Sequence, residues 1–288
     1  MKRFLTVIFC ALALSAPGVS SQPRVMARFV PERADDFVWE NDLVAYRVYG
    51  KALEGNPTSP GFDVWVKLPG KLVADDWYSH AVQNPGYYHL DHGGKDCYKV
   101  AVSLGAGASA LITDGKVNYP STNYREWKIL ESTDDKVVFS LKYPSWRVGE
   151  VRVALEKTIT VIPGTYFCKC QDTYTFSGSE TIDVAAGIFL HAPGNVEHTY
   201  SRKGVYAIWE QASDQSAEPE DGRIGVGIIV PGSGKATLSD DGLHALLGRT
   251  IRSGESFTYY FGSCWSKGDL ESADLWFETV RKYCKSVR

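Results

Sequence analysis

The sequence has no apolar run long enough to cross a bilayer as a helix, which takes about 20 residues. The apolar stretch near the N-terminus, Phe4–Leu14, is too short. Two basic residues precede it, and the small residues of Val19-Ser20-Ser21 follow it at a spacing that suits cleavage. This pattern is typical of a secretory signal peptide. We therefore expect residues 1–21 to be removed, and residues 22–288 to work in the periplasm or outside the cell.

The sequence also lacks a strong excess of charge, because its formal net charge is only −3. Such a chain has no broad cationic field to attract phosphates, so nucleic acid is not an expected partner. It contains no phosphate-binding Walker loop, dinucleotide fingerprint, Gly-x-Ser-x-Gly elbow or His-Glu-x-x-His motif. We therefore expect no cofactor and no membrane span, while the oligomeric state stays open.

Cysteine is scarce, and its number after signal cleavage is odd. The remaining cysteines are Cys97, Cys168, Cys170, Cys264 and Cys284. In an oxidising compartment at most two disulfides can form, and one of the open possibilities is Cys264–Cys284. Because no second paired spacing accompanies Cys168 and Cys170, a structural zinc site is not favoured.

Apolar and polar residues alternate through much of the chain, which predicts strands with one face in a core. The alternating segments are 42–50, 61–69, 136–144, 150–164, 164–176, 223–231 and 255–265. A long helix is predicted over Asp269–Lys285 with Asp269 as N-cap, and a short helical turn over Ala74–Val82. Because the strands follow one another closely, we predict one large antiparallel β-sandwich over residues 22–288 with a C-terminal helix.

The segment GYYHLDHGGKDCYKV, residues 86–100, has the most concentrated polar chemistry in the chain. Its histidines His89 and His92 suit proton transfer near neutral pH, and Asp91, Tyr98 and Lys99 lie close to them in sequence. Three interpretations stay open: a catalytic or sugar-binding site, a solvated loop with a structural histidine, and a metal site. The metal site is the least favoured, because His-x-x-His with one aspartate shows no third ligand.

Two strands carry polar rows that suit an acidic sugar. Alternation places Arg47 and Tyr49 on one face, and Lys51 would continue their row. Such a row is either an ordinary sheet surface or a cationic groove for carboxylates. In the next strand Asp63 and Trp65 share a face with Lys67, as in a sugar platform or an edge strand.

The remaining candidates for substrate binding are aromatic residues with polar neighbours. Aromatic residues make up 12% of the chain, a share that suits a β-protein or a sugar-binding protein. The candidates are Trp39 with Glu40, Trp209 with Glu210, and Trp265 with Lys267. Binding loops gather at strand ends, which is where several of these residues are expected.

Five blocks in order resemble a bacterial family of secreted proteins, family 4861 of the domains of unknown function. The blocks are FVWENDLVAYRVYGKAL, GFDVWVK, YYHLDHGGKDCYKVAVSLGAGASAL, LEKTITVIPGT and YYFGSCWSK. The resemblance implies a galactose-mutarotase-like supersandwich and work beside enzymes that degrade pectin and other uronate polysaccharides. Family members often have His-Glu-Asp-His-Gly-Glu-Gly where this chain has HLDHGGK. Leu90 therefore replaces a family glutamate, and no role of that glutamate carries over.

We therefore predict a carbohydrate-active protein for acidic, uronate-containing, pectin-like oligosaccharides, acting as a lyase or a hydrolase. In a lyase, Arg47 or Lys99 would neutralise the carboxylate, His92 or His89 would be the base, and Tyr98 or Tyr49 the acid. A hydrolase needs two carboxylates, for which Glu40, Asp91 and Glu210 are candidates. The alternatives are a sugar mutarotase or epimerase, and a binding module without catalysis.

Overall fold

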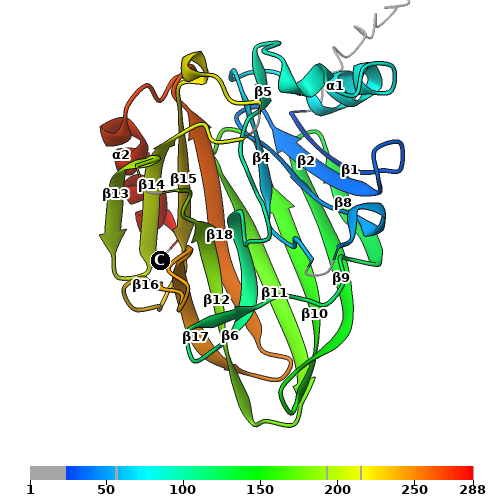
Figure 1. Cartoon of the computed structure of the whole chain (residues 1–288), viewed down its shortest axis with the longest axis vertical. Coiled ribbons are helices and arrows are strands. Elements are labelled where there is room, and N and C mark those ends of the chain that lie inside the picture. Colours follow the sequence, from blue (N-terminus) through cyan, green and yellow to red (C-terminus); the bar gives the residue numbers. More distant parts are fainter. Residues whose placement is uncertain (1–23, 56–57, 193, 215, 288) are drawn as a thin grey trace, which may run out of the picture.

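The computed structural model describes residues 24–55, 58–192, 194–214 and 216–287. Within these ranges the chain forms antiparallel sheets and two α-helices (Figure 1). The predicted antiparallel β-architecture with a C-terminal helix is confirmed. The predicted signal peptide lies outside the described residues, so export stays a prediction. In the described part of the chain, no helix is both long enough and apolar enough to span a membrane.

The central element of the fold is an eight-stranded sheet, whose strand order is β13-β14-β15-β18-β11-β10-β9-β8. Its strands are β8 (Glu126–Thr133), β9 (Lys136–Val148), β10 (Val151–Val161), β11 (Phe167–Ser177), β13 (Val196–Arg202), β14 (Val205–Gln211), β15 (Arg223–Ile229) and β18 (Ser256–Trp265). Every pairing in it is antiparallel, as the closely spaced strands predict.

Two five-stranded sheets accompany it. The first runs in the order β1-β2-β3-β4-β5, and the second in the order β16-β17-β12-β6-β7. The first contains β1 (Val25–Val30), β2 (Asp36–Asn41), β3 (Ala45–Val48), β4 (Asp63–Lys67) and β5 (Gly94–Asp96). The second contains β6 (Ala106–Thr113), β7 (Lys116–Asn118), β12 (Thr181–Phe189), β16 (Thr237–Leu238) and β17 (His244–Arg252).

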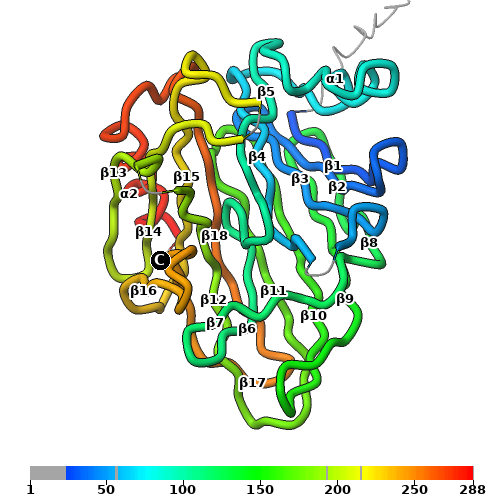
Figure 2. Tube along the Cα trace, viewed as in Figure 1, coloured from blue at the N-terminus to red at the C-terminus, as the bar shows by residue number. Residues whose placement is uncertain are grey.

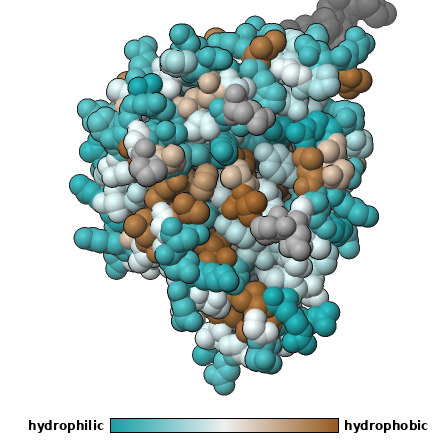
Figure 3. All heavy atoms as spheres, viewed as in Figure 1, coloured by the Kyte–Doolittle hydropathy of each residue, from teal (hydrophilic) through white to brown (hydrophobic). Residues whose placement is uncertain are grey.

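The main core lies where these sheets pack on the large one. Trp39 of β2, Tyr46 of β3 and Phe62 just before β4 surround Phe261 of β18, with ring centroids 6.2, 5.1 and 4.7 Å from that of Phe261. In the second small sheet, Gly107 of β6 approaches β18 so closely that a Cβ would lie 2.5 Å from Phe261 Cβ. Its φ of +123° also favours glycine. The face of the molecule seen in Figure 3 is mainly polar at its outline, and apolar residues gather towards its middle and lower part.

A smaller core lies on the opposite face of the first sheet, beneath α1 (Ala74–Ala81), and includes Trp65, Trp77, Tyr78 and Tyr88. Trp65 lies 4.9–5.3 Å from the other three rings. The short 3₁₀ helix η2 (Tyr87–His89) belongs to this layer, and η1 (Lys51–Leu53) and η3 (Pro219–Asp221) are further single turns. The predicted alternation of side-chain direction is therefore confirmed in β3 and β4. Side chains on one face of these strands pack in the main core, and those on the other face pack in the smaller core.

The C-terminal helix α2 (Ala273–Ser286) packs beside β14 and β15 at the edge seen on the left of Figure 1. Its predicted apolar stripe is confirmed, since Trp276, Val280 and Cys284 are buried. The predicted start is wrong: the helix begins after Ser272, whose side chain accepts a hydrogen bond from the backbone N–H of Leu275. Asp269 instead accepts a hydrogen bond from the hydroxyl of Tyr166.

The cysteines of the described residues are all buried free thiols. The possible Cys264–Cys284 disulfide is therefore not formed, although both residues are buried in the main core. Cys168 and Cys170 point from β11 into that same core, as the strand period predicted.

Candidate functional site

A cavity of about 280 Å³ opens beside the first sheet, and we call it the Arg47 pocket. Its lining comes from the β1–β2 turn, the end of β3, η2, the chain after β5, and the loop after β14. The lining residues are Arg33, Arg47, Tyr49, His89, Asp96, Tyr98, Lys99, Val100, Ala101 and Asp214. Residues predicted for catalysis or binding from the sequence are thus brought together from two segments that are distant in the chain, namely Arg47, Tyr49, His89, Tyr98 and Lys99.

Arg47 lies at the base of this pocket and is held by carboxylates of its own chain. Antiparallel pairing places Arg47 opposite Asp63, and places Trp65 opposite Asp96 on the next strand. Arg47 Nε donates to Asp63 Oδ2 at 2.7 Å, and Nη2 donates to Asp96 Oδ2 at 2.6 Å. The rings of Tyr49, Trp65 and Tyr88 surround the guanidinium at 5.2–5.4 Å. Arg47 therefore does bind carboxylates, but internal ones, and has no charge to spare for a substrate.

Carboxylates are in excess around this arginine. Asp36 lies 3.8 Å from Arg47 Nη1, and Asp214 faces the same pocket. Burial raises the pKa of Asp36 to about 6. Burial, with the neighbouring charge of Asp63, also raises the pKa of Asp96 well above its ordinary value. The polar side of the pocket thus has buried carboxylates that are difficult to ionise together.

His89 reaches the pocket from η2. Its backbone N–H closes the turn on Gly86, and Tyr88 beside it stacks on Trp65. His89 Nδ1 lies 3.3 Å from the backbone oxygen of Asp96, and 3.9 Å from Oδ2 of both Asp96 and Asp214. One ligand atom of each of these residues lies within 4.8 Å of the others, so together they could hold a metal ion.

The third member of this group, Asp214, was not predicted from the sequence, because it lies far from His89 and Asp96 along the chain. The backbone N–H groups of Ser213 and Asp214 donate to the carbonyl of Cys97, and Ser216 Oγ donates to the carbonyl of Asp96. The loop after β14 is thereby fixed against β5, and the two segments meet at the upper end of the molecule (Figure 2). In the sequence, Asp214 follows the candidates Trp209 and Glu210 by a few residues, and no other pattern pointed to it.

Tyr98 lies in the wall of the pocket with an unusual hydroxyl. Its side chain is buried, and its oxygen has no hydrogen-bond partner among the described residues. Burial raises the pKa of Tyr98 well above its ordinary value, so the hydroxyl keeps its proton at neutral pH. A buried polar atom without a partner is uncommon, which singles out this hydroxyl beside the pocket.

Behind Tyr98 lies a buried pair, His191 and Glu210. His191 Nδ1 lies 2.8 Å from Glu210 Oε2, and Nε2 lies 2.7 Å from the backbone oxygen of Lys99. Burial lowers the pKa of His191, but the hydrogen bond and charge of Glu210 outweigh it and raise the pKa overall. Because both ring nitrogens face oxygen acceptors, the pair fixes the backbone of Lys99 next to Tyr98. The structure thus gives Glu210 a buried supporting position.

Lys99 itself lies at the exposed mouth of the pocket. Within the described part of the chain its ammonium group makes no ion pair at 4.0 Å or less, in contrast to Arg47. It is therefore the cation of this pocket that is available to an anionic ligand.

His92 lies outside the pocket. Its exposed ring stacks on Tyr87 with centroids 3.9 Å apart, and Tyr87 stacks on His80 at 4.5 Å. The two histidines separate because the chain leaves η2 extended at Leu90. His89 and His92, which were both candidate bases from the sequence, therefore do not share one site.

Asp91 and Lys267 lie on a neighbouring hollow of about 470 Å³ that also borders His89. Asp91 Oδ1 accepts hydrogen bonds from the N–H groups of Gly93 and Gly94, and Lys267 Nζ lies 3.2 Å from Asp91 Oδ2. These residues tie the η2 loop to the loop after β18. Their position beside the Arg47 pocket is compatible with a second subsite.

The proposed tryptophan platforms are not on the surface. Trp39, Trp65, Trp209 and Trp265 are 0, 1, 4 and 4% exposed, so their faces pack on protein and not on a sugar. Glu40 is also internal: it accepts hydrogen bonds from the N–H groups of Val73 and Ala74 and so caps α1. Asp63 is held by Arg47 and Tyr49, and Lys51 is exposed on η1. The aromatic ring that is accessible, Trp127 at 43% exposure, was not singled out from the sequence.

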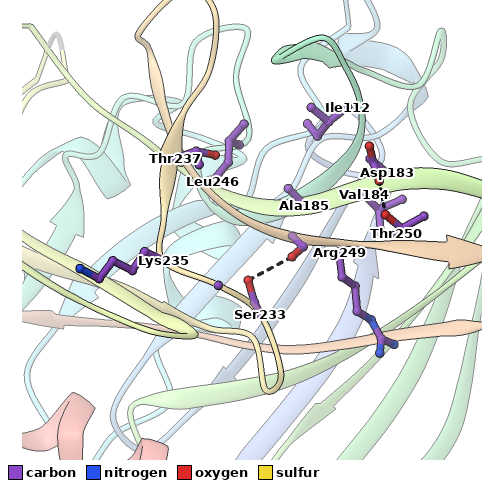
Figure 4. Close-up of a pocket in the computed structure, with 12 residues that line it drawn as sticks. Ile112, Asp183, Val184, Ala185, Ser233, Lys235, Thr237, Leu246, Arg249 and Thr250 are labelled. Carbon is purple, nitrogen blue, oxygen red and sulfur yellow. Dashed lines mark hydrogen bonds between the residues drawn. The ribbon is translucent and has the colours of Figure 1, made fainter.

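A second hollow, of about 300 Å³, lies on the second five-stranded sheet (Figure 4). Its polar groups are committed to local structure: Thr250 donates to Asp183 at 2.5 Å, and Ser233 donates to the carbonyl of Gly248 at 3.0 Å. Lys235 and Arg249 extend in different directions. With no cluster of titratable groups facing one another, this hollow is a weaker candidate than the Arg47 pocket.

Comparison with known proteins gives a family match across nearly the whole chain. A family model described as "Domain of unknown function (DUF4861)" matches residues 17–288. An uncharacterized protein P7 from Formosa agariphila is 31% identical in an alignment of 286 residues, which covers 93% of this chain and 69% of that protein.

Solved structures show weaker likenesses. An α-galactosidase from Lactobacillus brevis aligns with a TM-score of 0.40 and 11% identity over 82% of this chain and 40% of its own. A 4-α-glucanotransferase from Thermococcus litoralis gives 0.39 and 10% over 85% and 40%. A galactose mutarotase related enzyme from Lactobacillus acidophilus gives 0.30 and 8% over 80% and 97%. This chain spans about 40% of the length of the first two.

Proposed function

Because this chain belongs to the family of the domain of unknown function 4861, as its sequence blocks predicted, we propose that it is a carbohydrate-active enzyme of that family, acting on an acidic glycan in the Arg47 pocket. The observation that carries this proposal is the meeting of a histidine, an unpartnered tyrosine hydroxyl and an unpaired lysine in one cavity. A protein that only binds glycans needs exposed aromatic platforms, and its predicted ones are buried.

The reaction that this set supports best is β-elimination at a uronate. The base removes the proton at C5, the electron pair forms the C4–C5 double bond, and the bond from C4 to the leaving oxygen breaks. The leaving oxygen then takes a proton from the acid. His89 is the base in this proposal, because it reaches the pocket and His92 does not. Tyr98, which holds its proton, is the acid, and Lys99 faces the carboxylate.

Hydrolysis is the second candidate, and a specific observation supports it. Oxygen atoms of Asp96 and Asp214 lie within 4.8 Å of each other in the same pocket. This is close to the separation of about 5–5.5 Å between the carboxyl groups of retaining glycosidases. The sequence candidates Glu40, Asp91 and Glu210 do not form such a pair, since Glu40 and Glu210 are internal and Asp91 pairs with Lys267.

The test is an assay of the purified protein on uronate oligosaccharides, with absorbance at 235 nm for the new double bond and mass analysis of the products. We expect absorbance to rise with the wild type, and its rate to fall by about 10²–10⁴-fold in Tyr98→Phe and in His89→Ala. His92→Ala, outside the pocket, is the matched control and should keep the wild-type rate.

Each other outcome has a defined meaning. New reducing ends without absorbance at 235 nm would replace elimination by hydrolysis. Measurable affinity for the oligosaccharides without any product would reduce the protein to a binding module. Full activity in Tyr98→Phe would remove Tyr98 from the reaction.

A further inference from the structure

The group formed by His89, Asp96 and Asp214 is assembled from three separate segments: η2, β5 and the loop after β14. The distance of 3.9 Å from His89 Nδ1 to each carboxylate is too long for a hydrogen bond. The same nitrogen faces both carboxylates without touching either. Coordination bonds of about 2.0–2.6 Å let two ligand atoms lie about 4–5 Å apart across one ion.

The charges around this group favour an added cation. Arg47 is engaged by Asp63 and Asp96, and Arg33 Nη1 lies 3.6 Å from Asp36. Asp214 has no lysine or arginine within 4.0 Å among the described residues, and its carboxylate accepts a hydrogen bond from Ser216. Arg47 uses only Oδ2 of Asp96, and no described residue donates to Oδ1. Carboxylate oxygens are therefore still available on the side of His89.

A second observation points to a ligand in the same cavity. Tyr98 is 2% exposed and contributes to the lining of the pocket, and its buried hydroxyl has no hydrogen-bond partner among the described residues. A buried polar atom without a partner is uncommon and usually marks an ion, water or substrate. The hydroxyl of Tyr98 lacks a hydrogen-bond partner, and an oxygen or nitrogen atom of a hydrated ion or of its ligand would provide one.

We propose that His89, Asp96 and Asp214 bind a divalent cation. The mixture of one imidazole and two carboxylates suits a first-row ion such as Mn²⁺ or Zn²⁺ better than a site made of oxygen alone. Three protein ligands leave positions open towards the pocket. Binding requires Nδ1 without its proton, so the long 3.3 Å contact with the Asp96 carbonyl is given up.

The role of this ion in the reaction rests on the function proposed above, whereas its binding does not. A cation here supplies the positive charge that Arg47 cannot spare for a uronate carboxylate. With the ion bound, His89 would be a ligand, and the ion would lower the pKa of a coordinated water and so supply the hydroxide that accepts the proton in place of His89.

The experiment titrates Mn²⁺, and separately Zn²⁺, into the full chain after treatment with EDTA, with calorimetry and thermal unfolding as readouts and without substrate. We expect one site per chain and a rise in Tm. Asp214→Asn and His89→Gln should weaken binding by about 100-fold or more, which exceeds the usual effect of a residue behind the ligands. The side chain of Asp214 is partly exposed and has Ser216 as its one hydrogen-bond partner among the described residues, so this variant should fold.

A matched control should keep wild-type affinity: Asp240→Asn, an exposed carboxylate in the loop after β16. No saturable binding, or equal binding by Asp214→Asn, overturns the site. Glycan turnover that resists EDTA together with no binding leaves His89 as the base and removes the ion. Binding without turnover of any acidic glycan keeps the ion and removes the proposed function.

Discussion

Two of the buried cations among the described residues, Lys157 and Arg47, have different surroundings. Lys157 of β10 lies inside the main core, with Nζ 2.7 Å from Asp172 Oδ2 and 3.1 Å from Ser109 Oγ. Their side chains are 1 and 0% exposed, and the second oxygen of Asp172 accepts a hydrogen bond from Cys170. Arg47 is almost as buried, but more than one carboxylate surrounds it and a pocket opens beside it.

This difference separates a structural ion pair from a site. Around Lys157 one positive charge meets one negative charge, and Lys157, Ser109 and Cys170 all make hydrogen bonds within the network. Around Arg47 the carboxylates outnumber the nearby cations, and polar atoms including Arg47 Nη1, Asp63 Oδ1 and Tyr98 Oη lack partners. Unmatched charge and unmatched hydrogen bonds inside a cavity are expected where a protein works on another molecule.

The largest expected effect comes from removing the charge of Lys157 from its ion pair with Asp172. Lys157→Met leaves Asp172 buried without its cation, and should lower the free energy of unfolding by about 3–5 kcal/mol. Urea unfolding followed by circular dichroism measures this. The double variant Lys157→Met with Asp172→Leu should recover most of the loss, because no charge stays uncompensated. A loss below about 1 kcal/mol in Lys157→Met would mean that the pair is not the closed structural unit described here.

The next effect is a pH dependence confined to the Arg47 pocket. Burial raises the pKa of Asp36 from 3.8 to about 6, so between these values the folded state keeps a proton that the unfolded chain has lost. Stability therefore falls as the pH rises through this window, by about 1.4 kcal/mol per pH unit and about 3 kcal/mol in all. Asp36→Asn removes this part of the slope.

Urea unfolding of wild type and Asp36→Asn at pH 4 and at pH 6.5 gives the comparison. We expect the variant to lose less stability than the wild type over this interval. Near pH 7 Arg47 keeps Asp63 and Asp96 as partners, so the variant should unfold within about 1 kcal/mol of the wild type or above it. Equal slopes in the two proteins would show that Asp36 is not the carboxylate that resists ionisation.

The sequence predicted the part of the fold that local periodicity controls. In β3 and β4 the alternation correctly separated Tyr46 and Val64 from Arg47 and Asp63, because successive side chains of a strand point to opposite faces. It did not reveal β8, an edge strand that is exposed on both faces and so has no buried face to impose a pattern. The start of α2 was misplaced because Asp269 and Ser272 are both good caps, and tertiary contacts decide between them.

The pocket could be predicted only in part, for the same physical reason. Arg47 and Tyr49 share a row in one strand, and His89 and Tyr98 lie in one segment, so local sequence placed them near each other. Asp214 reaches His89 through hydrogen bonds to Cys97 that only the folded chain makes. The prediction that Trp39 binds a sugar failed because residue type does not show exposure. A tryptophan on the surface and a tryptophan in the core look alike in a sequence.

The smallest expected effect uses two buried tyrosines to sharpen the comparison. Tyr174 Oη lies 2.7 Å from Ser109 Oγ in the Lys157 network, while Tyr98 Oη has no partner among the described residues. Tyr174→Phe should therefore lower the free energy of unfolding by about 1 kcal/mol, the usual contribution of one hydrogen bond. Tyr98→Phe should leave it unchanged or raise it slightly, since the hydroxyl is buried without compensation.

Urea unfolding of both variants at pH 7 tests this prediction, and the glycan assay supplies the opposite ranking. If Tyr98 serves a ligand, its variant loses activity while it keeps stability, whereas Tyr174→Phe loses some stability while it keeps activity. A stability loss in Tyr98→Phe equal to that of Tyr174→Phe would give Tyr98 a structural partner within the folded chain. The hydroxyl groups of Tyr174 and Tyr98 would then no longer distinguish the Lys157 network from the Arg47 pocket.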